Sequence, residues 1–373
     1  MNNMMIKMRK GYQYAITPTQ QQAQKIEQNI GCARFIYNKL LEDKIKYYET
    51  NKKSIRLTPA PYKSEYPFLK DADSMALTNA QINLETAFKK FSDEPKIGFP
   101  KFKCKHKCRA SYTTNRVNNN IRITESDQNH RMYIKLPKLG EVKIKLHRLP
   151  QGSLKSVTVF RQADKYYVSI LFEEEIEISK CPIIKGIGLD YSQKELYVNS
   201  EGNHCGYPHY YRVSERKLAR ENRKLSKMKK GSNNYIKQKA KIAKLHLHIA
   251  NQRKDFLHKE SRKIANSYDY VAVEDIDMKA LSQALHLAKN LLDNGFGMFR
   301  KMLEYKLEEQ GKVLVKVDKW YASTQICHQC GSKQKMELKE RQYICPKCGY
   351  EADRDENAAK NLREEGKRIL ESI

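Results

Sequence analysis

Hydrophobic and polar positions follow distinct patterns in the first quarter of the chain. Residues 1–17 alternate around Tyr12 and Tyr14, which predicts a strand. Apolar residues then recur at helical spacing to about residue 50, and again over residues 73–91. These patterns predict a strand followed by two amphipathic helices whose apolar stripes belong to a core.

A period of two replaces the helical pattern from about residue 97 to residue 175. It is clear in residues 142–146 and 166–172, and it predicts strands of an antiparallel barrel or sandwich. Beyond Pro182 predicted strands alternate with predicted helices, which favours an α/β domain in the C-terminal half. The strands of this domain are expected at residues 183–190, 196–199, 270–274 and 313–317, with a helix at about 298–310.

The chain is strongly basic. It has 71 Lys and Arg residues against 43 Asp and Glu residues, a net charge of +28, which favours binding to polyanions such as phosphate backbones. Residues 211–263 hold 18 of the basic and 4 of the acidic residues, on two predicted helices joined near residues 231–233. A charged run is usually a solvated face, but this excess is one-sided. We therefore interpret it as a phosphate-facing surface.

The sequence predicts a cytoplasmic protein with no membrane partner. It has no run of 18 apolar residues that could cross a bilayer, and its first residues lack the apolar segment of a signal peptide. The number of cysteines is nine, and four of them have metal-type spacing. This usage fits a reducing compartment better than a disulfide framework.

Two Cys-x-x-Cys turns, 14 residues apart, predict a zinc knuckle. Each turn presents two thiolates to one ion, and two turns complete a tetrahedral shell that leaves no position open for catalysis. We therefore expect a structural zinc ion, with His328 outside the shell. The expected ligands are Cys327, Cys330, Cys345 and Cys348. Cys104 and Cys108 have less typical spacing and no second pair, so we interpret their segment as a basic loop with incidental cysteines.

Acidic residues stand at three places that suit a magnesium site. Asp190 and Glu274 each come at the end of a predicted apolar strand, and the last helix begins with the acidic segment 353–359. Carboxylates that converge from strand ends and a helix start are the ligands that hard Mg²⁺ ions prefer. Two such ions promote phosphodiester hydrolysis. A single Asp at a strand end is more often a cap or a surface group, so the interpretation depends on the accompanying zinc knuckle and basic helices.

With these residues the chain resembles the TnpB family, which bacterial insertion sequences encode and which is related to type V CRISPR effectors. The resemblance covers nearly the whole chain. Its motifs, besides the two cysteine pairs, are residues 31–38 (GCARFIYN), 98–102 (GFPKF), 111–114 (SYTT), 135–140 (KLPKLG), 253–259 (RKDFLHK) and 353–359 (DRDENAA).

The resemblance implies a multidomain α+β fold. A β-barrel wedge domain would comprise residues 1–17 and 97–181, interrupted by a helical recognition domain at 18–96. An RNase H-like (RuvC) α/β nuclease domain would comprise residues 182–325 and 349–373. The inserted zinc module for target nucleic acid would be residues 326–348.

The resemblance also implies the roles of individual residues. Asp190, Glu274 and Asp355 match the catalytic carboxylates that hold two Mg²⁺ ions, and the four cysteines match the ligands of one Zn²⁺ ion. The first motif reads Gly-Ile-Gly-Leu-Asp, whereas Gly-Ile-Asp-Leu-Gly is commoner, so only alignment of the strand end brings Asp190 into the site. The family's final motif, Asp-x-Asn after Asp-Arg, selects Asp355 and leaves Asp353 as a helper or a cap.

Members of this family take a guide RNA and cut double-stranded DNA beside a short flanking motif, so we expect these partners, one protein per RNA and a bacterial nucleoid location. The residues that we expect to contact nucleic acid are polar or basic. They are Ser74, Thr78, Asn79, Thr113, Thr114, Lys229, Lys230, Arg253 and Lys254.

Three other functions compete with this hypothesis. An RNA-guided repressor without nuclease activity would share every binding feature, but it would not need all three carboxylates. An accessory DNA-binding protein of transposition is less well supported, and a single-strand transferase would need a His-hydrophobe-His metal pair followed by a catalytic Tyr on a helix. A simple RNA-binding module would leave the acidic residues unexplained.

Overall fold

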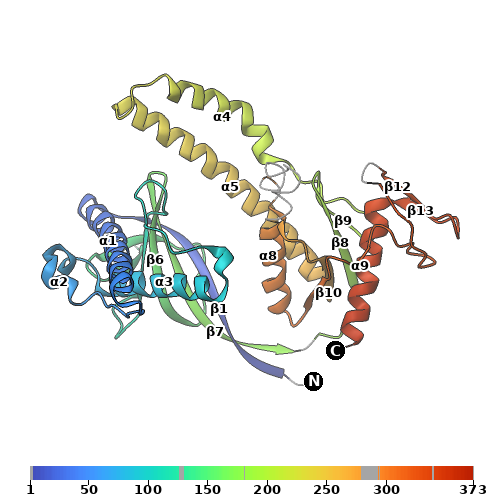
Figure 1. Cartoon of the computed structure of the whole chain (residues 1–373), viewed down its shortest axis with the longest axis horizontal. Coiled ribbons are helices and arrows are strands. Elements are labelled where there is room, and N and C mark those ends of the chain that lie inside the picture. The colour runs from blue at the N-terminus through green and yellow to red at the C-terminus, as the bar shows by residue number, and fades with distance from the viewer. Residues whose placement is uncertain are drawn as a thin grey trace. The chain divides into compact units, whose positions relative to one another are not determined.

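The computed structural model describes residues 3–125, 130–179, 181–278, 293, 295–337 and 340–372 (Figure 1). Contacts within the chain divide it into two compact units, Ile6–Ile176 and Glu177–Ile373 with Met1–Met5. We describe each unit by itself. No helix in the described ranges has an apolar stretch long enough to cross a bilayer.

The helices of the first unit confirm the helical patterns of the sequence. The predicted first strand is β1 (Asn3–Thr17), and the first helix, α1 (Gln20–Asn51), begins with a capping box between Thr19 and Gln22. The second long helix is α3 (Ser74–Asp93), and the buried stripes of α1 and α3 belong to one core. The shorter elements are α2 (Tyr62–Glu65) and the 3₁₀ helices η1 (Pro67–Lys70) and η2 (Pro95–Ile97).

A seven-stranded sheet completes the core of the first unit. Its order is β2-β6-β7-β1-β5-β4-β3, and the registers known for five of its pairs are antiparallel. Within the described residues this order is open, with β2 and β3 at its edges, so the closed barrel remains a prediction. The strands besides β1 are β2 (Ser111–Asn115), β3 (Arg122–Glu125), β4 (Met132–Leu136), β5 (Gly140–Lys145), β6 (Ser153–Gln162) and β7 (Lys165–Ser179).

The second unit is built on a four-stranded sheet of order β11-β10-β8-β9. Strand β10 runs parallel to both β8 and β11, whereas β9 pairs with β8 in the antiparallel direction. The strands lie at β8 (Gly186–Ser192), β9 (Leu196–Asn199), β10 (Tyr270–Glu274) and β11 (Val313–Val317). The last three match the predicted bounds, but β8 begins three residues later than predicted and continues two residues beyond Asp190.

Helices cover both faces of this sheet. Ile187, Leu189 and Val271 lie in one core with residues of α5 and α8, whereas α9 packs against β8 and β10 around Ala272 and Leu362. Because both faces are covered, residues 270–273 of the central strand β10 are apolar and fully buried. The helices are α4 (Tyr210–Ser226), α5 (Asn233–Ser267), α8 (Phe296–Glu308) and α9 (Arg354–Glu371), and a small hairpin comprises β12 (Gln342–Ile344) and β13 (Glu351–Asp353).

Candidate active site and zinc module

Two of the predicted carboxylates lie side by side on adjacent strands. Leu189 of β8 pairs in register with Val273 of β10, so the next residues, Asp190 and Glu274, occupy corresponding positions of parallel strands. Side chains alternate along a strand, and Leu189 and Val273 face the core formed with α5 and α8. Asp190 and Glu274 therefore face the opposite side of the sheet, which α9 covers.

A close backbone contact holds α9 against this side of the sheet. A Cβ atom at Gly188 would lie only 1.9 Å from the carbonyl oxygen of Ala359, so β8 admits no larger residue at that position. Further along α9, a Cβ atom at Gly366 would lie 2.6 Å from that of Ala272. These small residues let α9 lie directly on β8 and β10 and bring its first turn, with Asp355, to the Asp190 end of the sheet.

The two aspartates at the start of α9 have different surroundings. Asp353 is the N-cap residue, and its Oδ1 accepts hydrogen bonds from the backbone N–H groups of Asp355 (2.8 Å) and Glu356 (3.2 Å). Asp355 is half-buried in the first turn, where its carboxylate is 2.9 Å from Arg354 Nη2 and 3.7 Å from Arg341 Nη1. Asp353 thus serves as a helix cap. This is one of the two roles that the sequence left open for it.

The electrostatics of the site favour a bound cation. Asp190 is only 7% exposed, and burial, together with the nearby carboxylates of Asp355 and Glu274, raises its pKa well above the usual range despite the opposing charge of Arg354. Burial also raises the pKa of Glu274. The ligand oxygens of the three carboxylates do not all lie within 4.8 Å of one another, since in the described part of the chain only the cysteines form such a group. Carboxylates that hold two ions about 4 Å apart need not touch.

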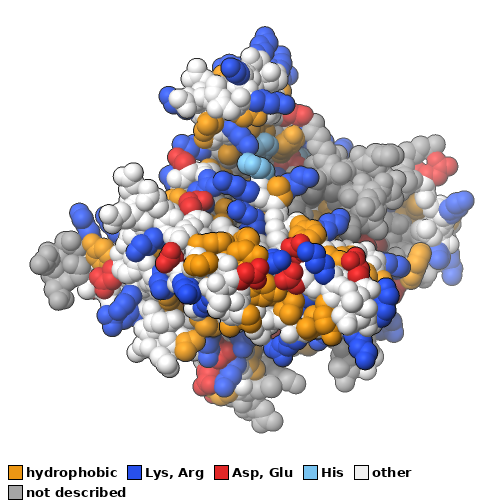
Figure 2. Space-filling model, turned by 60° about the vertical axis from the view of Figure 1, so that its left-hand side comes forward, with side chains coloured by type: hydrophobic (Ala, Val, Ile, Leu, Met, Phe, Trp, Pro, Cys, Tyr) orange, Lys and Arg blue, Asp and Glu red, His pale blue; other side chains and the backbone are white. Residues whose placement is uncertain are grey.

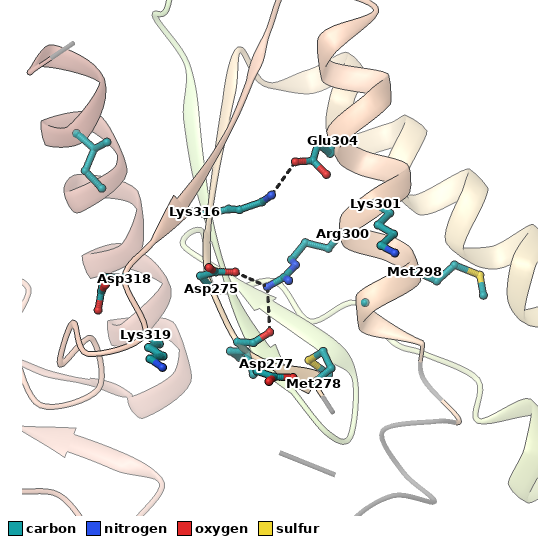
Figure 3. Close-up of a pocket in the computed structure, with 13 residues that line it drawn as sticks. Asp275, Asp277, Met278, Met298, Arg300, Lys301, Glu304, Lys316, Asp318 and Lys319 are labelled. Atoms are coloured by element: carbon teal, nitrogen blue, oxygen red, sulfur yellow. Dashed lines mark hydrogen bonds and ion pairs between the residues drawn. The ribbon is translucent and has the colours of Figure 1, made fainter. Parts of the chain in front are cut away.

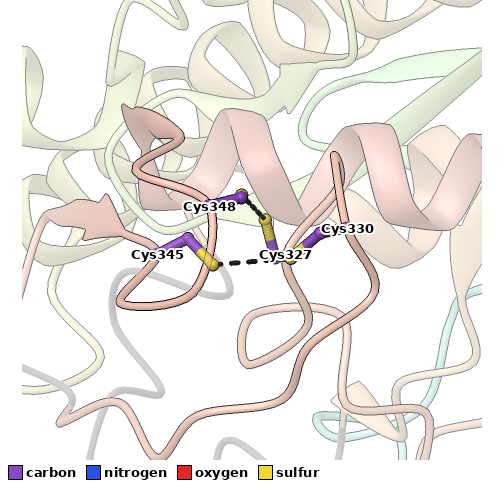
Figure 4. A group of neighbouring side chains, drawn as sticks. All are labelled: Cys327, Cys330, Cys345 and Cys348. Atoms are coloured by element: carbon purple, nitrogen blue, oxygen red, sulfur yellow. Dashed lines mark hydrogen bonds between the residues drawn. The ribbon is translucent and has the colours of Figure 1, made fainter.

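Four cysteines form a compact cluster in the second unit (Figure 4). The sulfur atoms of Cys327 and Cys348 are 3.6 Å apart, as are those of Cys330 and Cys345. Four sulfurs that each bind zinc at about 2.3 Å in a tetrahedron lie about 3.8 Å apart, so the donor set and its spacing fit one Zn²⁺ ion. His328 is not part of the group.

Asparagine side chains of α9 hold the first cysteine turn. The Asn361 amide donates to the carbonyl oxygens of Ser323 (2.8 Å) and Ile326 (2.7 Å), and the Asn357 amide donates to that of Ile326 (2.8 Å). Asn357 Oδ1 also accepts from the backbone N–H of His328 (3.1 Å). Because the same helix carries Asp355, these bonds join the zinc module to the candidate active site.

Arg300 of α8 was not predicted from the sequence, although it contacts the end of β10. Its Nη1 donates to the carbonyl oxygens of Glu274 (3.2 Å) and Ile276 (3.3 Å) and lies 3.4 Å from the carboxylate of Asp275. No spacing rule connects residue 300 with residue 274, because the two meet only through packing of α8 against the sheet. The same reason explains why Asn361 was missed.

The residues of the first unit that we expect to contact nucleic acid differ in their exposure to solvent. Ser74 is exposed, although its hydroxyl accepts from Lys63 Nζ (2.8 Å), and Thr78 is half-buried. The Asn79 amide donates to the carbonyl oxygens of Met75 (2.9 Å) and Thr113 (3.0 Å), so it ties α3 to β2.

The two threonines of β2 differ in the same way. The Thr113 hydroxyl is half-buried, 2.8 Å from that of Thr158. Thr114 is fully buried, so its side chain does not reach the surface where a nucleic acid could contact it. The expectation of a Thr114 contact conflicts with this burial, because the alternation of β2 turns that side chain into the core.

The predicted basic residues of the second unit lie on the α4–α5 hairpin, which carries many Lys and Arg side chains at the top of the view in Figure 2. Lys229 and Lys230 are exposed in the turn between the helices, and Lys254 is exposed on α5. Arg253 is largely covered, with Nη2 3.7 Å from the buried Asp293 carboxylate. Arg253 therefore contributes mainly to the interior of the unit.

A buried carboxylate ties the two helices of the hairpin together. The Glu221 side chain of α4 is 2% exposed, and its carboxylate accepts a hydrogen bond from Gln238 Nε2 of α5 (2.8 Å) and lies 3.0 Å from Lys241 Nζ. The hydrogen bonds from Gln238 and Lys241 lower the pKa of Glu221 to about 2. The remaining charge of the hairpin is almost entirely positive.

Three family models match successive parts of the chain. The one described as "Helix-turn-helix domain" matches residues 4–53, where the structure has a strand and one long helix. "Probable transposase" matches residues 169–285, and "Cas12f1-like, TNB domain" matches residues 296–362, which include the four cysteines.

Similar proteins extend over the whole chain. A "Putative RNA-guided DNA endonuclease" of Streptomyces pristinaespiralis is 32% identical, over 96% of this chain and 90% of the relative. The chain belongs to the TnpB family. Another TnpB relative, "Putative RNA-guided DNA endonuclease InsQ" of Escherichia coli (strain K12), is 29% identical over 98% of this chain and 94% of its own length.

A solved structure has the same fold as this TnpB chain. The structure described as "Cryo-EM structure of the Cas12f1-sgRNA-target DNA complex" matches with a TM-score of 0.61 and 15% identity, over 92% of this chain and 83% of the other. The family assignment from the sequence is thus confirmed, and so is a mixed α/β fold with a four-cysteine cluster.

Proposed function

We propose that this chain is an RNA-guided DNA endonuclease whose catalytic residues are Asp190, Glu274 and Asp355. The single observation that carries the proposal is the register of β8 and β10, which sets Asp190 beside Glu274 on the face to which α9 brings Asp355. The names of the relatives support the same activity. No membrane partner enters the proposal.

The order of the sheet supports an RNase H-like, RuvC-type nuclease domain. Along the chain, the antiparallel pair β8 and β9 comes first. Strands β10 and β11 follow; β10 pairs with β8 and β11 pairs with β10, both in the parallel direction. The carboxyl ends of β8 and β10 lie at one edge, where ligands of open α/β sheets bind. The acidic pair stands at that edge.

The residues of the site would hold two Mg²⁺ ions, because three carboxylates converge there and the pKa of the buried Asp190 is raised by its burial and by the other two carboxylates. When bound, the ions activate a water molecule and stabilise the leaving oxygen. Hydrolysis adds water across the phosphodiester: a P–O bond to water forms, the P–O3′ bond breaks, and the 3′ oxygen takes a proton, which leaves a 5′-phosphate. Asp190 and Glu274 fix the position of the reaction on the rigid sheet, and the cap at Asp353 orients the turn that carries Asp355.

The guide RNA and the target DNA are the proposed partners. The exposed Lys and Arg residues of the α4–α5 hairpin suit an RNA backbone, while base pairing supplies sequence specificity. Ser74 and Thr78 on α3, with Thr113, remain the proposed contacts to the motif beside the target. The Zn²⁺ ion of the four cysteines would be structural, since four thiolates leave no open position.

The proposed domain boundaries follow from the family. Residues 1–17 and 97–181 would form the wedge domain, residues 18–96 the recognition domain, residues 182–325 and 349–373 the nuclease domain, and residues 326–348 the zinc module. The contacts within the chain divide it between Ile176 and Glu177. This division supports a boundary between the wedge and recognition domains on one side and the nuclease domain and zinc module on the other.

A plasmid library with randomised sequence beside the target tests the activity. The protein is purified with RNA co-expressed from its own locus and incubated with the library and Mg²⁺. We expect cleavage beside a defined flanking motif, and no cleavage by Asp190→Ala. Guide-dependent binding without cleavage by the unaltered protein would instead identify it as a repressor, the second candidate from the sequence.

A further inference from the structure

A hollow of about 1000 Å³ lies between α8 and the carboxyl ends of β10 and β11 (Figure 3). Asp275 and Met278 line it after β10, Lys316 and Lys319 lie in or after β11, and Lys301 faces it from α8. The hollow thus adjoins the strand end that carries Glu274, yet none of its lining residues has a part in the proposed reaction.

The charges of the hollow do not by themselves select a ligand. Lys316 Nζ is 2.7 Å from a carboxylate oxygen of Glu304, so this cation is neutralised. In the described ranges Lys301 and Lys319 form no ion pair, but the carboxylates of Asp277 and Asp318 also line the hollow. A mixture of both signs favours neither a free phosphate nor a cation. The ligand class must come from another feature.

That feature is Trp320, the single tryptophan of the chain, which follows Lys319 directly. Its side chain is 82% exposed. The turn beneath it is fixed, since Asp318 Oδ1 accepts from the Trp320 N–H (2.7 Å) and the Asp318 carbonyl accepts from the Tyr321 N–H (2.9 Å). Lys319 Nζ lies over the indole ring, 5.0 Å from its centroid. An exposed indole beside a cation, on a turn held by hydrogen bonds, suits stacking on a nucleic-acid base.

The turn is also close to the candidate active site. Glu274 pairs in register with Val317, and Trp320 comes three residues after Val317, a path of about 10 Å at most. The backbone N–H of Asp275 donates to the Val317 carbonyl (2.8 Å) and continues the pairing to the edge of the sheet. A strand of nucleic acid at the carboxylates would therefore pass within reach of the indole.

We propose that Trp320, assisted by Lys319, is a stacking platform that holds bases of single-stranded DNA at the end of β11, next to this hollow and near the carboxylates. The assignment to DNA rests on the proposed function, in which DNA is the strand that is cut. Stacking requires an unpaired base, so the platform selects single strands over duplex and does not depend on base sequence.

The test uses tryptophan emission, because this chain has one tryptophan and its signal comes from one place. The Asp190→Ala protein with its guide RNA bound is titrated with a short single-stranded DNA, with the same sequence as duplex, and with the RNA equivalent, all at one salt concentration. We expect saturable quenching by single-stranded DNA and much weaker quenching by duplex, whereas the RNA equivalent should quench no more strongly than the DNA. Variants at residue 320 have no tryptophan, so their binding is followed by the fluorescence anisotropy of a labelled single-stranded DNA, with the Asp190→Ala protein measured in the same way. In this assay Trp320→Ala should raise the Kd for single-stranded DNA about 5- to 150-fold.

Two variants complete the design. Trp320→Phe keeps a stacking ring and should restore most of the affinity, whereas Tyr48→Ala removes an exposed aromatic side chain on α1 and should leave the Kd unchanged. Unchanged emission at saturating DNA, an unchanged Kd in Trp320→Ala, or stronger quenching by RNA would overturn the proposal. Because the Asp190→Ala protein does not need to cut, loss of the nuclease hypothesis would leave this binding result intact. Cleavage by the unaltered protein without quenching would overturn only the platform.

Discussion

At the scale of single residues, the start of α9 shows how two aspartates separated by one residue acquire different roles. Asp353 accepts two backbone N–H groups and ends the preceding strand, so its oxygens are used by the helix. Asp355 is the second residue of the helix, near enough to Asp190 to raise the pKa of that residue. The distinction follows from cap geometry and not from acidity.

Replacement of each aspartate should therefore have a different effect. Asp355→Ala is expected to lower the cleavage rate by at least about 1000-fold, equivalent to about 4 kcal/mol of transition-state stabilisation. Asp353→Ser keeps an N-cap, so stability should change by less than about 1 kcal/mol and cleavage by less than about tenfold. Single-turnover cleavage rates and thermal unfolding measure both. Equal losses of activity in the two variants would contradict the assignment.

Gly188 is the residue whose replacement tests the docking of α9. An added methyl group would meet the carbonyl oxygen of Ala359, so Gly188→Ala must push the helix away from β8. We expect a loss of about 1–3 kcal/mol of stability, measured by denaturant unfolding, together with reduced cleavage. Gly31→Ala is the control, because an added Cβ atom in α1 meets nothing within 4 Å and should leave stability the same or higher.

At the scale of elements, α9 contacts both the sheet and the zinc module. Its buried Asn357 and Asn361 satisfy backbone groups of the segment before and within the first cysteine turn. The zinc module is therefore bonded to the helix that carries Asp355, although it supplies no ligand to the carboxylate site.

Asn361→Asp tests this link. The substitution keeps the shape but removes the donor, and it sets a carboxylate against the carbonyl oxygens of Ser323 and Ile326. We expect a loss of about 1–3 kcal/mol of stability and faster release of zinc to a chelator. Asn222→Asp, on an exposed position of α4, controls for the added charge. Zinc release at the unaltered rate in Asn361→Asp would argue against the link.

The α4–α5 hairpin is expected to respond to acid through Glu221. Its folded-state pKa of about 2 lies below the ordinary value of 4.5, so the ionised carboxylate stabilises the hairpin above the ordinary value. This contribution decreases as the pH falls from about 4.5 toward 2. The difference in unfolding temperature between the unaltered protein and Glu221→Gln should thus be present at pH 6 and diminish over that range.

Glu308→Gln, at an exposed position of α8, is the matched control and should show no such difference. A Glu221→Gln difference that stays constant from pH 6 to pH 3 would mean that the charge of Glu221 has no role in joining the two helices.

Much of the fold could be predicted from local patterns, because a strand such as β10 is buried on both faces and its residues 270–273 form an uninterrupted apolar run. The cysteine spacing likewise predicted the cluster. What could not be predicted depends on contacts between distant segments: Arg300 at the end of β10, Asn361 under the cysteine turn, and the burial of Thr114. The closure of the first sheet depends on strand order, which no local pattern encodes.

At the scale of the whole molecule, the chain combines a net charge of +28 with an acidic site at one edge of a sheet. The two features suit different steps, binding and cutting. The positive residues favour nucleic acid at many points of the surface, as the α4–α5 hairpin illustrates in Figure 2. In the proposed function, the carboxylates instead need metal ions before a phosphate can approach them. Binding and cutting are therefore expected to be separable, with Mg²⁺ required only for cutting.

The most direct test of the central claim is to change the guide segment of the bound RNA and map the cut. Two plasmids carry different targets beside the same flanking motif, and each is offered to protein loaded with either guide. We predict that the cut moves with the guide, requires Mg²⁺, and is absent in Asp190→Ala with RNA binding retained. A cut that ignores the guide, or that persists in Asp190→Ala, would contradict the account.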